Sequence, residues 1–316
     1  MFFNTKKYKE DAEKNHKHNL SKDPSRFNMI VLAILATIAP LRIFLRLHKQ
    51  HIDDRTTVEK KRGNFEQIPI IYFHGFRGGD YTTNVMVKTA LKEKGDTNYL
   101  KVTADLLGNF KLEGTWTGDE NPIIQVVFRQ RIVGVYAIDY YLRFVLPFLA
   151  KHYHFTHYTA VAHSLACPCV VRTEMRTYRK KNFPRLTKCI FIAGPFDGVT
   201  YLGDIPNVNG FNHNGRPNVI NIHYLYLLFH RKQFNPNISV LNIYGNVLDN
   251  TNSDKFISVI SAKSIRYILA PNAKSYHEVE VRGSKDAEHS WMHDNPFVIN
   301  MVNKFIGFKN NSGGLK

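Results

Sequence analysis

The residue best placed for nucleophilic chemistry is Ser164, at the centre of the stretch YTAVAHSLACPCVVRTEM over residues 158–175. An apolar run meets the short polar break His163-Ser164, and small residues then lead into a helix-like segment. A strand, a sharp turn and a helix in that order can hold a serine hydroxyl at the end of a sheet, within reach of a general base. The usual pattern at such a turn is G-x-S-x-G, whereas this chain has Ala162 and Ala166 in place of the glycines. The added methyl groups predict a slightly more open turn or a slower enzyme.

A serine hydroxyl is a weak nucleophile, so it needs a histidine base that is itself oriented by a carboxylate. In α/β folds that carry such a serine, the acid and then the histidine follow it along the chain. Asp254 and His289 occupy that order, each in a loop after a predicted strand. Because the carboxyl ends of parallel strands meet at one edge of a sheet, both loops are expected to converge on Ser164. Asp249 and Asp197 remain competing acids, and His74 and His163 remain competing bases.

The oxyanion of an acyl-transfer intermediate requires backbone N–H donors on two sides of the site. Leu165, directly after the nucleophile, supplies one expected donor. Phe76 supplies the other, because His74-Gly75-Phe76 follows a predicted strand and runs into two glycines that let the backbone approach a substrate. The sequence does not indicate which side chains bind the rest of the substrate.

The segments around these residues alternate between strand and helix. Residues 69–73 form a short apolar run typical of a strand buried on both faces. Further strands are predicted at 99–104, 121–129, 158–162, 188–194 and 239–244, and residues 276–281 alternate like a last strand. Helical spacing of apolar residues is found at 82–94, 136–153, 220–229 and 296–308. This alternation predicts the α/β class, with an α/β-hydrolase fold built on a doubly wound, mostly parallel sheet flanked by helices.

Composition narrows the function classes. The 316 residues are 43% hydrophobic, enough for one large globular domain, and the formal net charge is +17. This charge favours anionic partners, but the basic residues are scattered and no nucleic-acid-binding motif is present, so nucleic-acid binding is not expected. The chain has three cysteines, too few for a disulfide framework and wrongly spaced for a zinc site. His289 and His293 lack the HExxH pattern, so neither a metal nor another cofactor is expected.

The N-terminal part of the chain differs from the rest. Residues 1–26 form a polar basic tail, and residues 27–47 form a hydrophobic segment whose uncharged portion is shorter than the about 20 residues that span a bilayer. We expect an uncleaved membrane anchor or signal-like helix here, with a cleaved signal peptide or a buried first helix as alternatives. The charged residues 48–66 predict a linker, residues 67–308 an α/β-hydrolase domain, and residues 309–316 a flexible C-terminus.

Several motifs occur in a fixed order: PIIYFHGFRGG, NPIIQVVF, AVAHSLA, FIAGPFDGV, VLNIYG, NSDKFISVISAKS and AEHSWMHDNPFVINMVNKFI. Together they resemble the DUF915 family of α/β-hydrolases over residues 67–307. The resemblance implies a lipase-like serine hydrolase of a low-GC Gram-positive bacterium, with a triad at Ser164, Asp254 and His289. Such proteins are often membrane-associated or exported, which implies a hydrolase domain on the extracellular face. Glycine commonly follows the acid in this family, whereas this chain has Lys255.

We therefore predict a serine hydrolase that cleaves a carboxylic ester, of small-molecule or lipid-like type, through an acyl-enzyme intermediate. Aromatic and aliphatic residues in 136–148 and 220–229 favour an apolar pocket for the acyl group. The alternative is a non-catalytic, membrane-tethered surface-binding protein on a degenerate hydrolase fold. The two alanines beside Ser164 and the positive charge favour that alternative.

Overall fold

The computed structural model describes residues 50–205 and 207–308. The predictions for residues 1–26, 27–47 and 309–316 therefore lie outside the described residues. Within those two ranges, no helix is both long enough and apolar enough to span a bilayer.

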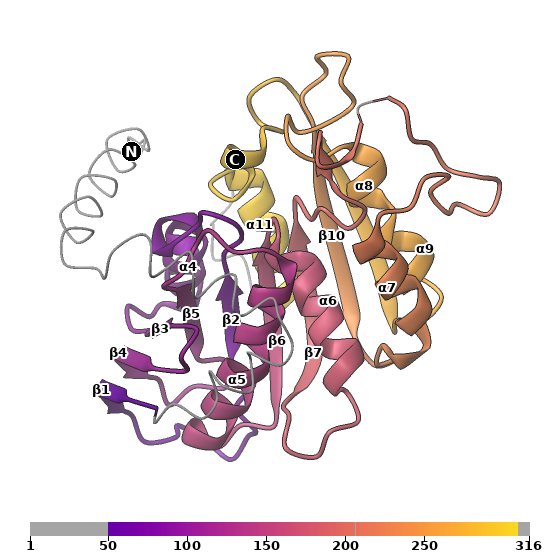
Figure 1. Cartoon of the computed structure of the whole chain (residues 1–316). Coiled ribbons are helices and arrows are strands. Elements are labelled where there is room, and N and C mark those ends of the chain that lie inside the picture. Colours follow the sequence, from indigo (N-terminus) through magenta and orange to yellow (C-terminus); the bar gives the residue numbers. More distant parts are fainter. Residues whose placement is uncertain (1–49, 206, 309–316) are drawn as a thin grey trace.

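The described residues form a nine-stranded sheet with the order β1-β4-β3-β5-β2-β6-β7-β10-β11 (Figure 1). All neighbouring pairs from β3 to β11 in this order are parallel. Burial on both faces explains why β2 is a continuous apolar run and why β6 carries no charged carboxylate, lysine or arginine. The strands are β1 (Ile52–Val58), β2 (Ile70–Phe73), β3 (Leu100–Ala104), β4 (Phe110–Trp116), β5 (Ile123–Phe128), β6 (His157–His163), β7 (Arg185–Ile192), β10 (Ser239–Asn246) and β11 (Ser275–Arg282), with β8 (Val199–Thr200) and β9 (Gly203–Asp204) forming a separate pair.

Strands β4 and β1 run opposite to the other strands of the large sheet, because β4 pairs antiparallel with β3 and β1 pairs parallel with β4. Ile52 at the start of β1 is level with Phe110, and Phe110 is level with Ala104, the last residue of β3. The chain thus enters the sheet at the edge where the parallel strands end. Within residues 48–66, which the sequence predicted as a linker, residues 52–58 form strand β1 of the sheet.

Helices cover both faces of the sheet (Figure 1). They are α4 (Asp80–Lys94), α5 (Val135–Tyr153), α6 (Ala166–Thr177), α7 (Ile222–His230), α8 (Val259–Lys263), α9 (Ile265–Leu269), α10 (His289–Met292) and α11 (Pro296–Ile306). Successive strand residues point to opposite faces, so Ile70 and Tyr72 of β2 pack with α4 and α11, whereas Ile71 and Phe73 pack with α5, α6 and α7. The predicted doubly wound, mostly parallel architecture is confirmed.

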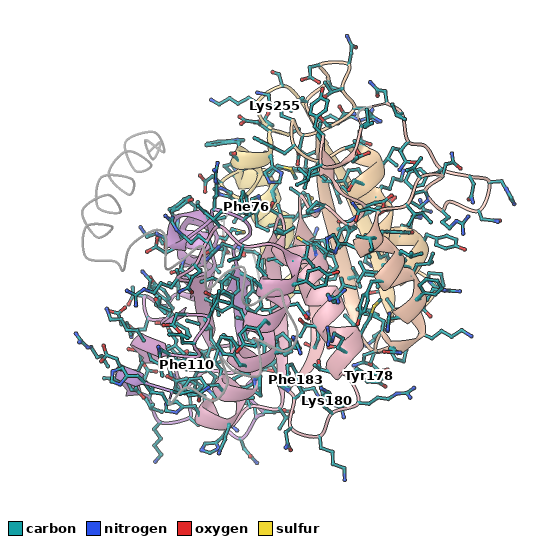
Figure 2. The ribbon with its side chains drawn as sticks, in the orientation of Figure 1. Phe76, Phe110, Tyr178, Lys180, Phe183 and Lys255 are labelled. Atoms are coloured by element: carbon teal, nitrogen blue, oxygen red, sulfur yellow. The ribbon has the colours of Figure 1, made fainter. Side chains whose placement is uncertain are left out.

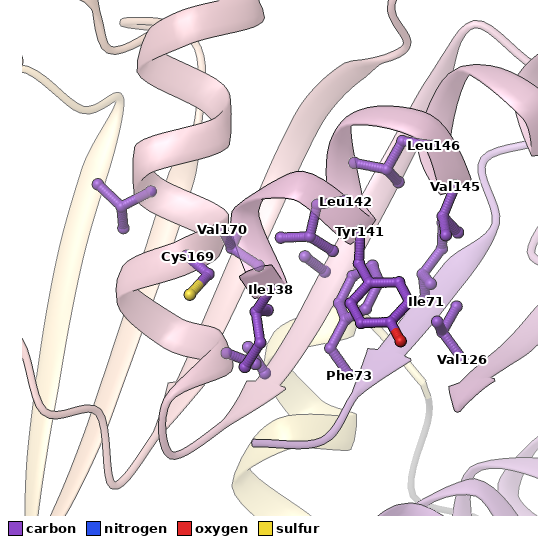
Figure 3. Packing of buried hydrophobic residues seen from close by; sticks show 14 of the residues in the cluster. Ile71, Phe73, Val126, Ile138, Tyr141, Leu142, Val145, Leu146, Cys169 and Val170 are labelled. Atoms are coloured by element: carbon purple, nitrogen blue, oxygen red, sulfur yellow. The ribbon is translucent and has the colours of Figure 1, made fainter. Parts of the chain in front are cut away.

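The larger buried cluster lies between the sheet and the helix pair α5 and α6. Figure 3 shows side chains of these two helices, among them Ile138, Tyr141, Leu142, Cys169 and Val170, together with Phe73 of β2 and Val126 of β5. All three cysteines are free and buried. This packing fixes α6 on the sheet, and α6 begins two residues after Ser164.

Candidate active site

Ser164 occupies the turn between β6 and α6, with a φ of +56° that residues other than glycine rarely adopt. Its N–H donates to the carbonyl oxygen of Ile192 at 2.8 Å, and its own carbonyl accepts from the N–H of Cys167 at 2.9 Å. The turn is therefore held by β7 on one side and by the first turn of α6 on the other. This is the strand, sharp turn and helix that the sequence predicted.

The two alanines beside this turn are accommodated in the core. Ala162 and Ala166 are each 0% exposed. Ala162 keeps its place in the sheet, level with Phe73 of β2 and Phe191 of β7. The slower catalysis that their methyl groups suggest stays a prediction.

The side chains of Ser164, His289 and Asp254 are linked by two hydrogen bonds. The Oγ of Ser164 lies 2.9 Å from Nε2 of His289, and Nδ1 of His289 lies 2.8 Å from Oδ2 of Asp254. A carboxylate can only accept, so Nδ1 carries the imidazole proton and Nε2 accepts from the serine hydroxyl. This tautomer leaves Nε2 able to take up the hydroxyl proton.

The carboxylate of Asp254 is fixed by the loop around it. Its Oδ1 accepts from the backbone N–H groups of Phe256 at 3.0 Å and Ile257 at 2.7 Å, which leaves Oδ2 for His289. The backbone carbonyl of Asp254 also accepts from the N–H of His289 at 3.0 Å. Asp254 and His289 are thus joined through both their side chains and their main chains.

The competing acids, Asp197 and Asp249, accept hydrogen bonds from residues other than His289. Asp197 accepts from the N–H of Asn221 at 2.7 Å, and burial raises the pKa of Asp197 to about 7. Asp249 is exposed and accepts from the hydroxyl of Thr251 at 2.6 Å. Of the three candidate acids, Asp254 is the one that the structure pairs with His289.

The competing bases also have other partners. His74 donates from Nδ1 to the carbonyl oxygen of Gly75 at 2.9 Å and accepts at Nε2 from the N–H of Phe128 at 3.0 Å. Burial lowers the pKa of His74 to about 4, so the imidazole is neutral. His163 donates from Nε2 to the carbonyl oxygen of His289 at 3.2 Å. Burial, together with the neighbouring His293 and His289, holds the pKa of His163 well below its usual value.

The loop after β2 lies directly against the serine turn. A Cβ atom on Gly75 would stand 2.8 Å from the backbone nitrogen of Leu165 and 2.9 Å from Cβ of Ser164, so only glycine fits there. Within the described ranges, the N–H groups of Phe76 and Leu165 donate to no protein acceptor. Unpaired N–H groups in the residue after Ser164 and in the loop that packs against its turn could serve a developing oxyanion.

Gly245 is a residue of the site that the sequence reasoning missed. A Cβ atom at this position would stand 2.2 Å from the carbonyl oxygen of Ala287 and 3.0 Å from Cβ of Asp254. The end of β10 can therefore approach the loops of both the acid and the base only because residue 245 has no side chain. No sequence signal reveals this, because the contact joins segments far apart along the chain.

Within the described residues, no group of three or more histidine, cysteine, aspartate or glutamate side chains could hold a metal ion. The expectation that the chain uses no cofactor stays a prediction.

Comparisons with known proteins show the family of the chain. Residues 57–309 match the family described as alpha/beta hydrolase of unknown function (DUF915). The chain belongs to this family.

Two solved structures that are similar to the chain cover most of its described residues. The product of gene lin2722 from Listeria innocua is 26% identical, with a TM-score of 0.70 over 78% of this chain and 96% of that protein. A candidate cell surface hydrolase from Lactobacillus plantarum is 19% identical, with a TM-score of 0.62 over 76% of this chain and 92% of that protein, which shows a shared fold. No curated protein matches the sequence.

Proposed function

We propose that this member of the DUF915 family is a serine hydrolase that cleaves carboxylic esters through an acyl-enzyme intermediate. The observation that carries the proposal is the pair of hydrogen bonds from Ser164 Oγ to His289 Nε2 at 2.9 Å and from His289 Nδ1 to Asp254 Oδ2 at 2.8 Å. These distances match the geometry that a serine nucleophile, its base and its orienting acid require.

In the first half of the reaction, Ser164 Oγ attacks the ester carbonyl carbon while His289 Nε2 takes the hydroxyl proton. The carbonyl electron pair moves onto oxygen, where the N–H groups of Phe76 and Leu165 stabilise the negative charge. The intermediate then collapses, the carbon to alkoxy-oxygen bond breaks, and the leaving alcohol receives the proton from His289. Asp254 stabilises the imidazolium that exists between these two proton transfers.

In the second half, water replaces the alcohol. His289 takes a proton from the water as its oxygen attacks the acyl carbon, and a second oxyanion forms in the same place. Collapse of this intermediate breaks the bond to Ser164 Oγ, which recovers its proton from His289. The carboxylic acid leaves and the free serine is restored, so the sum of the cycle is ester plus water to acid plus alcohol.

The test is covalent labelling with a fluorophosphonate, which reacts only with an activated serine. The wild-type chain should be labelled, Ser164→Ala should not, and Ser284→Ala, which changes an exposed serine, should be labelled at the wild-type rate. Equal labelling of the wild type and Ser164→Ala would remove Ser164 as the nucleophile.

Ester specificity needs a separate measurement. Release of p-nitrophenol from short and medium acyl esters should depend on Ser164 and His289, whereas the matching p-nitroanilides should turn over far more slowly. Labelling without ester turnover would show an activated serine with another substrate. If the chain showed neither labelling nor turnover but still bound a membrane surface, the non-catalytic membrane-tethered alternative would be favoured.

Anchoring through residues 27–47, with the hydrolase domain on the extracellular face, also stays a proposal, because that segment lies outside the described residues. Its support is the hydrophobic composition of the segment. Fractionation of expressing cells, with protease added to intact cells, tests both parts. Recovery in the membrane fraction with cleavage by external protease is expected, and a protease-protected membrane form would contradict the orientation.

A further inference from the structure

Exposed apolar side chains gather at the edge of the sheet that carries Ser164. The five central strands follow one another as β5, β2, β6, β7 and β10, and Ser164 follows the middle one. On both sides of Ser164, the loops after these strands expose large apolar residues, namely Ile132 after β5, Phe76 after β2, Tyr201 and Leu202 after β7, and Leu248 and Phe256 after β10. We call these six residues the rim.

The opposite edge of the sheet is different. Within the described ranges, the loops that lead into the amino ends of the parallel strands expose no large apolar residue. In Figure 2, Lys180 and Tyr178 lie low in the view, toward the opposite edge, and Lys255 and Phe76 lie higher in the view. The remaining exposed apolar residues lie on β1, at the start of α11 and along residues 205–229. The apolar surface is therefore concentrated on one end of the sheet.

Residues of the rim contact the candidate site and the loops beside it. The ring of Phe256 lies 5.5 Å from the ring of His289, and its carbonyl oxygen accepts from the N–H of Thr200 at 2.8 Å, next to Tyr201. On the other side, the N–H of Arg77 donates to the carbonyl oxygen of Arg131 at 2.8 Å, which joins the loops of Phe76 and Ile132. The apolar residues thus border the mouth of the site on both sides.

Cationic side chains are interspersed with the rim. Arg77 and Lys255 are exposed and directly follow or precede rim residues, and the whole chain carries a formal net charge of +17. Asp249 is the acidic residue next to Leu248. Apolar side chains with adjacent cations are the chemistry that binds the surface of an anionic bilayer, because the former enter the acyl boundary and the latter meet the headgroups.

We propose that the rim docks on the surface of an anionic lipid bilayer and turns the mouth of the site toward the lipid. This inference goes beyond the proposed function, because docking requires no chemistry from Ser164. Exposed apolar groups on a soluble domain mark an interaction surface, and the charge selects an anionic lipid surface as the partner.

The experiment places a polarity-sensitive fluorophore on the rim of the full-length chain. The three native cysteines are 0% exposed, so a cysteine introduced at the surface can be labelled selectively. Leu202→Cys and Leu248→Cys report on the rim, and Val58→Cys, which is 67% exposed on β1, is the matched control. All three are made in a Ser164→Ala background, which separates docking from catalysis.

Vesicles of equal parts phosphatidylglycerol and phosphatidylcholine should shift the emission of the rim labels to shorter wavelength and leave the Val58 label unchanged. Nitroxide-labelled lipids in the same vesicles should quench only the rim labels. High salt should reduce the effect, because it screens the attraction between cations and headgroups.

Several results would overturn the proposal. The proposal would be contradicted if the protein bound the vesicles but the emission of neither rim label shifted. An equal emission shift of the Val58 label, or an equal shift of the rim labels with phosphatidylcholine alone, would contradict it too. A shift that rises with protein concentration in the absence of vesicles would identify a second copy of the chain as the partner instead. As a second measurement, the double variant Leu202→Ser, Leu248→Ser should weaken vesicle binding by about tenfold or more, and Val58→Ser by less than about twofold.

Discussion

His163, the residue before the nucleophile, hydrogen-bonds through Nε2 to the backbone carbonyl oxygen of His289 at 3.2 Å. The serine turn therefore contacts the base in two ways, through the hydroxyl of Ser164 and through the imidazole of His163. The rings of His163 and His289 also lie 5.0 Å apart. We therefore propose that His163 positions His289 and does not itself act as the base.

Replacing His163 with leucine should remove this support while keeping most of the volume. The carbonyl of His289 would lose its partner, at a cost of about 1–3 kcal/mol in stability. We expect kcat for ester hydrolysis to fall about tenfold with little change in KM, because the base becomes misplaced. His163→Gln, which can still donate to the carbonyl, should recover part of the rate. A loss of stability in His163→Leu with unchanged kcat would contradict the positioning role.

The choice of acid can be tested with a matched pair of substitutions. Asp254→Asn places an amide N–H where Nδ1 of His289 now donates, which favours the wrong tautomer of the imidazole. We expect kcat to fall on the order of a thousandfold or more. Asp249→Asn should change kcat by less than about twofold, because Asp249 contacts its own loop. A similar loss in both variants would remove the distinction between the two acids.

Gly245→Ala should disturb the site by displacing the loop that carries His289. The new methyl group would stand 2.2 Å from the backbone oxygen of Ala287, which cannot rotate away, so the loop that carries His289 must move. We expect about a hundredfold loss of kcat and a lower melting temperature. Gly134→Ala is the control, since nothing lies within 4 Å of a Cβ there. Wild-type turnover in Gly245→Ala would show that the loop can adapt.

Lys255 adopts a φ of +81°, in the region that glycine enters without strain. Glycine is also the residue that commonly follows the acid in the DUF915 family. Because the side chain of Lys255 is exposed, Lys255→Gly should relieve backbone strain and stabilise the fold by up to about 1 kcal/mol. Denaturant unfolding measures the change, and Lys285→Gly, at an exposed position with ordinary backbone, should destabilise instead. A destabilised Lys255→Gly would contradict this account.

Glu174 makes stability depend on pH. Burial raises the pKa of Glu174 to about 8, partly opposed by Arg185. The folded state therefore keeps a proton that the unfolded state has released, and stability falls as pH rises from about 4.5 through about 8. Glu174→Gln should lose this dependence. The difference in melting temperature between the variant and the wild type should therefore shift in favour of the variant as pH rises from about 5 to about 9. Glu120→Gln, at an exposed position, should follow the wild type throughout, and parallel curves for all three chains would contradict the assignment.

The sequence predicted the parts of the fold that rest on continuous apolar runs. The central strands β2, β6, β7 and β10 are buried on both faces, which leaves an unambiguous pattern. The edge strand β1 reads IDDRTTV and escaped notice, because a half-exposed edge strand needs little apolar character. β4 carries an alternating signal in Phe110, Leu112 and Trp116 that could have been recognised.

The candidate site was predictable where chain order is informative. Ser164, Asp254 and His289 follow the order that their chemistry requires, and the structure places them within hydrogen-bond distance. The support from His163 and the close packing at Gly245 depend on contacts between segments far apart along the chain. Local pattern cannot reveal such contacts, because nothing in the neighbouring residues records what packs against them.

The direction of β1 has a consequence for any tether on this domain. Ile52 is level with Phe110, and Phe110 is level with Ala104 at the carboxyl end of β3, so the chain enters the domain at the β1 edge of the sheet. If residues 27–47 lie in a bilayer, the connecting segment of four residues, 48–51, has an extended length of at most about 14 Å. Such a short connection would keep the β1 edge of the sheet close to the membrane surface. Anchor and rim would then act as two linked contacts, and each would raise the effective concentration of the other.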